Sequence, residues 1–286
     1  MSDERADRRS LGVYSVSPIG FGAMRLTGRN MFGPPEDRIE AIAVLREAVD
    51  LGVDHIDTSE YYGPTVVNEM IREALFPYPE DLVLVSKVGA ARGPRGELIV
   101  AEEPIQLRRG IEDNLRTLGV EMIHVMNLRL HGTGFPDVDF DDKLEAMVTA
   151  RNDGLIGAVG LSNVTLDTLL YALNSLDVVC VQNAFNPLDR DSADVIEACA
   201  SQNIAFVPFA PLGFGASQVL NNPRVMQVAD RLGCTPAQVC LAWELDVAPN
   251  LLLIPGTSSR DHLRENLAAS QVDLDDQARY ELSNLE

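Results

Sequence analysis

The sequence predicts an α/β fold of the (β/α)8 TIM barrel type, in which eight parallel strands alternate with helices. Short apolar runs alternate with longer segments of helical periodicity along nearly the whole chain. The runs are continuously apolar, which is typical of strands covered on both faces. No linker rich in Pro, Gly or Ser interrupts the 286 residues, so one domain over residues 1–286 is expected.

The predicted strands are short and rich in apolar and β-branched residues. They cover residues 17–24, 55–58, 82–88, 122–130, 156–161, 178–182, 204–209 and 251–254. The predicted helices have apolar residues at helical spacing. They cover residues 38–51, 66–75, 104–118, 141–152, 166–175, 192–202, 223–232, 236–245 and 260–268. Gly52 and Gly119 follow two of these helices as stop signals.

An open, doubly wound sheet is the competing fold for such a chain. A dinucleotide-binding sheet of that kind has a GxGxxG motif after its first strand. Here Gly20 and Gly22 have no third glycine, and no acidic residue follows at the expected interval. The closed barrel is therefore favoured.

Composition excludes several classes of partner. The net charge of -20 argues against nucleic acid and anionic membranes, because both would repel the protein. The four cysteines and four histidines show no metal-ligand spacing, so no metal and only free thiols are expected. No apolar run approaches the ~20 residues of a transmembrane helix, and the N-terminus has no apolar core of a signal peptide. A cytoplasmic location is expected.

Polar residues stand where two of the predicted strands end. Asp57 ends the second strand, and Lys87 ends the third. Lys87 is one of only two lysines in the chain, the other being Lys143. A lysine at the end of an apolar strand is costly unless it is paired. In a barrel of this kind, the carboxyl ends of the strands form the active site.

Six segments together resemble the aldo-keto reductase family. They are DTSEYYG at 57–63, GLSN at 160–163, QN at 182–183, FVPFAPLG at 206–213, and IPGTSS at 254–259 with HLREN at 262–266; Lys87 matches the family's lysine. The resemblance covers nearly the whole chain in order. It implies reduction of a carbonyl in a small-molecule substrate by NADPH, with Tyr62 as proton donor and Asp57 and Lys87 beside it.

The resemblance also implies a cofactor site. Ser162, Asn163 and Gln182 match residues that hold the nicotinamide. The segment around Phe209 matches one whose aromatic ring stacks on the nicotinamide, and the last two segments match those that grip the adenosine 2′-phosphate and adenine. The implied cofactor-binding residues are Ser162, Asn163, Gln182, Phe209, Pro211, Leu212, Gly213, Gly256, Thr257, Ser258, His262, Glu265 and Asn266.

The chemistry explains these residue types. Hydride arriving at a carbonyl carbon leaves charge on oxygen, which a positioned acid must neutralise. The ordinary pKa of tyrosine is about 10, and a nearby ammonium lowers it by stabilising the phenolate. Each residue also has a structural interpretation: Asp57 as a turn cap, Lys87 as an ion-pair partner and Tyr62 as rim packing. Tyr61 competes with Tyr62 for the catalytic role, and the family spacing favours Tyr62.

The sequence departs from the family at the end of the fourth strand. The usual histidine, which orients the substrate carbonyl, is replaced by Arg129. A guanidinium can donate hydrogen bonds to a carbonyl or an anion but cannot exchange protons near neutral pH. Arg129 is therefore expected to bind the carbonyl, with a structural salt bridge as the alternative. His131, two residues on, is a second candidate for the substrate contact.

The adenine end departs as well. The lysine that many relatives use for the 2′-phosphate is replaced by Gly256, which leaves hydroxyls, arginines and a helix N-terminus for the phosphate. The candidates are Thr257, Ser258, Arg260, His262 and Arg264. NADPH is favoured over NADH. Ser258 or Ser259 can cap the following helix at the same time.

Four further segments resemble a bacterial subgroup of the family that includes pyridoxal reductase: FGPPEDR at 32–38, YGPTVVN at 62–68, IREAL at 71–75 and NLR at 127–129. This implies reduction of pyridoxal to pyridoxine. The alternatives are a ketoreductase acting on a larger secondary metabolite such as a polyketide, and a non-catalytic NADPH-binding regulatory subunit. Predicted substrate residues are Met24, Phe32, His131 and Phe214; Met126 is a further candidate, for which core packing is favoured. Residues 273–285 are expected to pack on the barrel or to mediate assembly.

Overall fold

A curved parallel sheet forms the centre of the computed structural model, which describes residues 8–132, 139–213 and 217–285. Its hydrogen-bonded strand order is β10-β9-β8-β7-β5-β4-β3, and every neighbouring pair is parallel. The strands are β3 (Phe21–Gly22), β4 (His55–Asp57), β5 (Val83–Arg92), β7 (Ile123–Arg129), β8 (Ile156–Ser162), β9 (Val178–Gln182) and β10 (Ala205–Phe206).

Residues 250–253 close the sheet into a barrel. Leu251 bridges to Phe206 in β10, and Leu253 bridges to Ile19, directly before β3. The amide of Leu253 donates to Pro18 O at 2.8 Å, and the carbonyl of Leu253 accepts from Gly20 N at 2.8 Å. The eighth strand position is thus filled by single bridges. The predicted (β/α)8 fold is confirmed.

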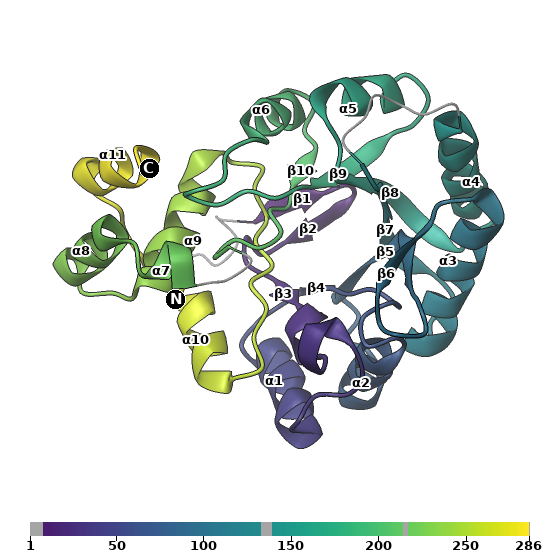
Figure 1. Cartoon of the computed structure of the whole chain (residues 1–286), viewed down its shortest axis with the longest axis horizontal. Helices are drawn as coiled ribbons and strands as arrows, with labels where there is room; N and C mark the ends of the chain where they lie inside the picture. The colour runs from purple at the N-terminus through teal and green to yellow at the C-terminus, as the bar shows by residue number, and fades with distance from the viewer. Residues whose placement is uncertain (1–7, 133–138, 214–216, 286) are drawn as a thin grey trace.

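A ring of helices surrounds the strands (Figure 1). The helices are α1 (Arg38–Asp50), α2 (Val66–Leu75), α3 (Pro104–Leu118), α4 (Phe140–Asn152), α5 (Leu166–Ala172), α6 (Ala193–Ser201), α7 (Ser217–Leu220), α8 (Pro223–Leu232), α9 (Pro236–Val247), α10 (Arg260–Ala268) and α11 (Asp276–Ser283). Short 3-10 turns are η1 (Ala23–Leu26), η2 (Arg29–Met31) and η3 (Ala269–Gln271). In the described part of the chain, no helix is long and apolar enough to cross a membrane.

Several predicted boundaries are wrong for local reasons. The strand predicted over 17–24 is regular only at β3, with an isolated bridge at Ile19, because η1 turns the chain from Ala23 onward. The strand predicted over 204–209 is regular only at β10, because Pro208 has no N–H for the ladder. The helix predicted over 166–175 ends at Ala172, where Asn174 N and Ser175 N bond to carbonyls three residues back. The strand predicted over 251–254 forms isolated bridges only.

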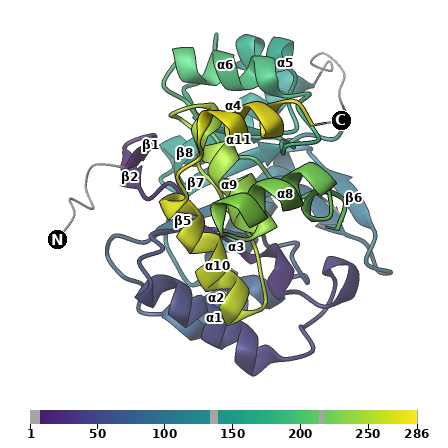
Figure 2. The same cartoon turned by 90° about the vertical axis from the view of Figure 1, so that its left-hand side faces the viewer.

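Two hairpins and a last helix were not predicted. β1 (Arg9–Leu11) pairs with β2 (Tyr14–Val16), and β6 (Leu98–Ala101) pairs antiparallel with the end of β5. Figure 2 shows these hairpins at opposite ends of the barrel. Leu11 and Val16 pack inside the barrel against the amino ends of the strands, so β1–β2 covers the bottom. α11 packs on α8 and α9 with Ala278 and Leu282 buried, as one interpretation of residues 273–285 predicted.

Candidate active site

Asp57 and Lys87 form a buried ion pair at the carboxyl end of the barrel. Asp57 is the last residue of β4 and pairs in register with Val85 of β5, so Lys87 lies two residues further along the neighbouring strand. Lys87 Nζ contacts Asp57 Oδ1 and donates to Thr58 O at 3.1 Å. Both side chains are buried, so each charge is neutralised by the other, as a buried ammonium requires.

Gln182 completes this group from the far side of the barrel. It ends β9, and its Nε2 donates to Asp57 Oδ2 at 2.6 Å. Its Oε1 is buried without a hydrogen-bond partner among the residues that the structure describes. A buried amide oxygen of this kind is costly unless a ligand satisfies it.

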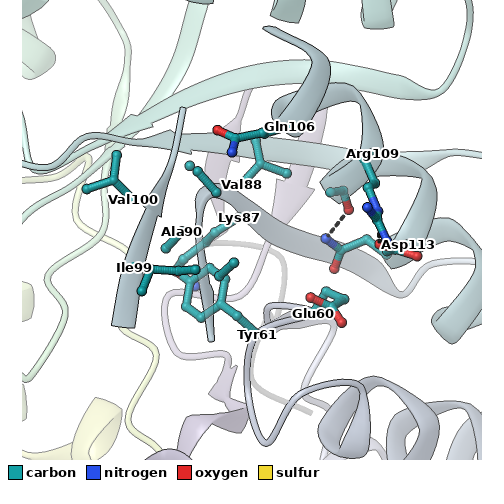
Figure 3. A pocket seen from close by; sticks show the side chains of 15 residues that line it. Glu60, Tyr61, Lys87, Val88, Ala90, Ile99, Val100, Gln106, Arg109 and Asp113 are labelled. Carbon is teal, nitrogen blue, oxygen red and sulfur yellow. Dashed lines mark hydrogen bonds and ion pairs between the residues drawn. The ribbon is translucent and has the colours of Figure 1, made fainter. Parts of the chain in front are cut away.

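The two neighbouring tyrosines face different cavities. Tyr62 lines a cavity at the barrel mouth together with Asp57 and Lys87. Tyr61 lines a second cavity, between the β5–β6 hairpin and α3, where it lies beside Ile99 and Lys87 (Figure 3). The rings of Tyr61 and Tyr62 meet edge to face, with centres 5.3 Å apart. Tyr62 is the one of the two that shares a cavity with both Asp57 and Lys87.

Burial dominates the acidity of Tyr62. It raises the pKa of Tyr62 well above the ordinary value, and the Asp57 carboxylate raises it further, while Arg129 and Arg92 lower it. Lys87 Nζ lies 5.3 Å from the centre of the Tyr62 ring, with its charge engaged by Asp57. The expected lowering of the pKa of Tyr62 by Lys87 is therefore not seen in this arrangement. The burial of Tyr62 thus favours its protonated form.

The barrel-mouth cavity brings together residues from five strand positions. Besides Asp57, Tyr62 and Lys87, its walls come from the loop after β3, the segment after β10 and the segment after residue 253. The predicted residues among them are Met24, Phe209, Pro211, Leu212, Gly213 and Gly256. The backbones at Gly22 and Gly256 are in close contact: a Cβ on Gly256 would lie 2.4 Å from Gly22 O. A side chain at either position would clash with the neighbouring backbone.

Ser162 and Asn163 lie at the carboxyl end of β8, which pairs with β7 and β9. Ser162 ends β8 in register with Arg129 on one side and Gln182 on the other. Asn163 adopts a left-handed conformation with φ of 61°, and its Nδ2 donates to Leu130 O at 3.1 Å. Both predicted cofactor residues therefore lie on the same rim as the buried Asp57–Lys87–Gln182 group.

The adenine-end candidates gather at the start of α10, but most already have partners. Ser259 caps α10, and Thr257 Oγ1 accepts from Ser259 N at 3.1 Å. Arg264 Nε lies 2.6 Å from Glu47 of α1, and Arg260 Nε lies 3.1 Å from Glu40. Ser258 and His262 are exposed, whereas Asn266 is buried. Glu265 accepts a hydrogen bond from Thr235 Oγ1.

The predicted substrate residues lie in different places. Met24 lines the cavity at the barrel mouth. Phe32 does not line this cavity. It packs against Gly96, at the tip of the β5–β6 hairpin. Phe214 lies outside the described residues. Met126 is fully buried in the main core, as favoured from the sequence.

Arg129 and His131 contact each other. Arg129 Nη1 lies 2.8 Å from His131 Nε2, and the other ring nitrogen of His131 lies 3.0 Å from Glu102 Oε1. The Arg129 charge still acts on Tyr62, where it lowers the pKa of the hydroxyl.

Two arginines near the site were not singled out from the sequence. Arg25 is exposed and lines the barrel-mouth cavity. Arg92, at the end of β5, donates to Tyr61 O at 3.3 Å and lowers the pKa of Tyr62 by its charge. Arg25 directly follows Met24, so extending that prediction by one residue would have found it.

The chain matches the model of the aldo/keto reductase family over residues 18–285. The chain belongs to this family. It is 45% identical over 279 residues to pyridoxine 4-dehydrogenase from Escherichia coli (strain K12), covering 96% of this chain and 97% of that protein. This aldo/keto reductase is therefore an oxidoreductase, as predicted, and the regulatory and polyketide alternatives are not favoured.

Solved structures of aldo/keto reductases superpose on nearly the whole barrel. A thermostable aldo-keto reductase, Tm1743, in complex with the inhibitor epalrestat has a TM-score of 0.82 at 28% identity, covering 96% of this chain and 98% of that one. An aldo/keto reductase from Klebsiella pneumoniae, in complex with NADP and acetate, has a TM-score of 0.78 at 25% identity, covering 94% and 90%.

Proposed function

We propose that this aldo/keto reductase uses NADPH to reduce the aldehyde of pyridoxal to the alcohol of pyridoxine, with Tyr62 as the proton donor. The observation that carries the proposal is the buried Asp57–Lys87 pair, which shares one cavity with Tyr62. The 45% identity to a pyridoxine 4-dehydrogenase supports the substrate, because that name describes the same reaction in the opposite direction.

The barrel mouth fits a nicotinamide cofactor. Gln182 Oε1 is a buried acceptor without a partner in the described residues, and a carboxamide N–H would satisfy it. Ser162 and Asn163 would hold the same group from β8, and Phe209 would cover the ring from the segment after β10. NADPH, when bound, supplies the hydride that the carbonyl carbon receives.

The adenine end would bind through residues 256–266. The backbone N–H groups at the start of α10 favour an anion, and Thr257, Ser258 and His262 add donors there. Arg260 and Arg264 are about half exposed in their ion pairs with Glu40 and Glu47, so exchange of these partners for a phosphate costs little. Glu265 and Asn266 would meet the adenine. This donor set supports NADPH over NADH.

Tyr62 would donate its proton to the carbonyl oxygen as the carbonyl carbon receives hydride. Its raised pKa keeps the proton on the hydroxyl until charge develops on the substrate oxygen. Lys87, held by Asp57, would stabilise the phenolate left behind. Arg129 would donate a hydrogen bond to an oxygen of the substrate, and Met24 would line the pocket, with Phe32, Phe214 and His131 as further candidate contacts.

We also propose that residues 1–286 form one domain that works in the cytoplasm. Elements from β1 to α11 belong to one barrel and its coverings. Cys180, Cys199, Cys234 and Cys240 all remain free thiols, which suits a reducing compartment. Cell fractionation with an antibody against the chain tests the location.

The decisive experiment measures the loss of NADPH absorbance with pyridoxal. We expect the wild type to turn over and Tyr62→Phe to lose about a thousandfold in kcat/KM, because the proton donor is removed. Tyr61→Phe is the matched control, since it removes a neighbouring hydroxyl that faces the other cavity, and it should keep wild-type activity. Equal losses in both variants would overturn the assignment of Tyr62. A wild type that binds NADPH but leaves pyridoxal unreduced would overturn the substrate.

A further inference from the structure

A chain of polar contacts leads from α4 to Arg129 at the edge of the site. Lys143 Nζ, in the first turn of α4, donates to Glu102 Oε2 at 2.6 Å. Glu102 Oε1 accepts from the backbone N–H of His131 at 2.6 Å and lies 3.0 Å from His131 Nδ1. His131 Nε2 in turn lies 2.8 Å from Arg129 Nη1. Three separate segments of the chain thus meet at one carboxylate.

These contacts hold the His131 ring between Glu102 and Arg129. Glu102 Oε1 lies within hydrogen-bond distance of both the backbone N–H and Nδ1 of His131. Arg129 Nη1 lies 2.8 Å from Nε2 and 3.3 Å from Nδ1, so the guanidinium lies against the imidazole ring. Glu102 accordingly anchors the ring on which Arg129 rests.

Glu102 is buried, so its charge needs a cationic partner, which Lys143 provides. Glu102 and Lys143 are 7% and 6% exposed, so their charges are compensated by each other and not by water. His131 and Arg129, by contrast, are both partly exposed. The buried Glu102–Lys143 pair is therefore the base to which the partly exposed His131 is bonded.

We propose that Glu102, held by Lys143, is a positioning residue that acts through His131 to fix the guanidinium of Arg129 at the end of β7, on the rim of the barrel beside Ser162. The proposal rests on the function proposed above, in which Arg129 binds a substrate oxygen. Nη1 of the guanidinium lies against the His131 ring, and this contact leaves the other N–H groups of Arg129 to meet the substrate. The role of His131 in this arrangement is to orient Arg129.

A double-mutant cycle tests the proposal. The variant Glu102→Met/Lys143→Met removes both members of the buried pair, so that no orphan charge is left to unfold the protein. It is compared in the wild-type and Arg129→Met backgrounds. We expect a loss of about tenfold in kcat/KM in the wild-type background and almost none in the Arg129→Met background, with an unchanged dissociation constant for NADPH. Glu103→Gln, one residue away and capping α3, is the control for charge and should keep wild-type activity.

Three outcomes overturn the proposal: unchanged kcat/KM in the double variant, equal losses in both backgrounds, or a loss confined to NADPH binding. Where the double variant does not fold, His131→Phe in the same two backgrounds replaces it, because it breaks the relay at a partly exposed residue and leaves Glu102 and Lys143 paired. A crystal structure of either variant provides a readout without turnover, since the Arg129 guanidinium should leave its wild-type position.

The substrate is tested separately by running each assay with pyridoxal and with 4-nitrobenzaldehyde. If only 4-nitrobenzaldehyde is reduced, pyridoxal is the wrong substrate, and the cycle on 4-nitrobenzaldehyde still decides the role of Glu102. If both aldehydes are reduced and the cycle is additive, the function stands and the positioning role of Glu102 is wrong.

Discussion

Gln182 and Asp57, which are 125 residues apart in the sequence, share a hydrogen bond of 2.6 Å across the mouth of the barrel. The bond occupies the one carboxylate oxygen of Asp57 that Lys87 leaves open. It also turns Gln182 so that Oε1 remains the free end of the amide within the described residues. One side chain thus bonds to the Asp57–Lys87 pair and presents an unpartnered buried acceptor.

Gln182→Leu should weaken NADPH binding by about fivefold, which corresponds to roughly 1 kcal/mol for one lost hydrogen bond. Fluorescence titration with NADPH measures it. Asn250→Leu is the control. Like Gln182 Oε1, Asn250 Oδ1 is buried without a hydrogen-bond partner in the described structure. Asn250 lies at the opposite end of the barrel, where its Nδ2 donates to Ile204 O. A control that weakens NADPH binding equally would mean that the effect is one of stability.

Lys87→Met should lower both stability and activity, and the two effects can be separated. Removal of the ammonium leaves Asp57 charged and buried, which costs about 3 kcal/mol or more in the free energy of unfolding. Asp57→Asn/Lys87→Met removes the orphan charge, so we expect most of the stability to return while kcat remains lost. Urea unfolding and initial rates of both variants measure this, and a double variant that recovers activity would show that Lys87 has no catalytic role.

Gly89→Ala should destabilise the barrel mouth. Gly89 has φ of 103°, and a Cβ there would lie 2.1 Å from Arg129 O on the neighbouring strand. Gly132→Ala is a matched control, because Gly132 has φ of 104° with nothing within 4 Å of the added Cβ. Both substitutions place alanine in a backbone conformation with positive φ, so this strain is common to both. We therefore expect Gly89→Ala to lower the free energy of unfolding by about 2 kcal/mol more than Gly132→Ala does, because only Gly89→Ala adds the backbone clash. Equal costs in urea unfolding would contradict this.

Glu244→Gln should stabilise the protein at alkaline pH. Glu244 is fully buried in α9, and neither carboxylate oxygen has a hydrogen-bond partner among the described residues. Burial raises the pKa of Glu244 well above 4.5. The folded state therefore holds the proton more tightly than the unfolded state, and stability falls by about 1.4 kcal/mol per pH unit from the unfolded pKa up to the folded one.

The stability of Glu244→Gln relative to the wild type should accordingly grow from pH 5 to pH 8. Thermal unfolding across this range measures it. The exposed Glu121→Gln is the control and should show no such growth. A constant difference between Glu244→Gln and the wild type would contradict the raised pKa of Glu244.

Much of the barrel could be predicted because its signals are local. α2, α3, α8 and α10 have the predicted bounds, since capping residues, prolines and glycines mark helix ends within a few positions. The edges of the sheet could not be predicted so well. Residues 251–253 bridge Phe206 and Ile19, and those bridges depend on how the barrel closes, which no local pattern encodes.

The sequence by itself determined the fold class, the family and the residue types at the strand ends. Motif spacing placed Tyr62, Lys87 and Asp57, because residues on adjacent parallel strands meet wherever the strands end. Only the tertiary structure decided which of these groups touch. Three contacts depend on packing between distant segments: Glu102 with His131, Gln182 with Asp57, and Tyr61 with the second cavity. Burial and contact distance are properties of the assembled barrel, so no local pattern in the sequence encodes them.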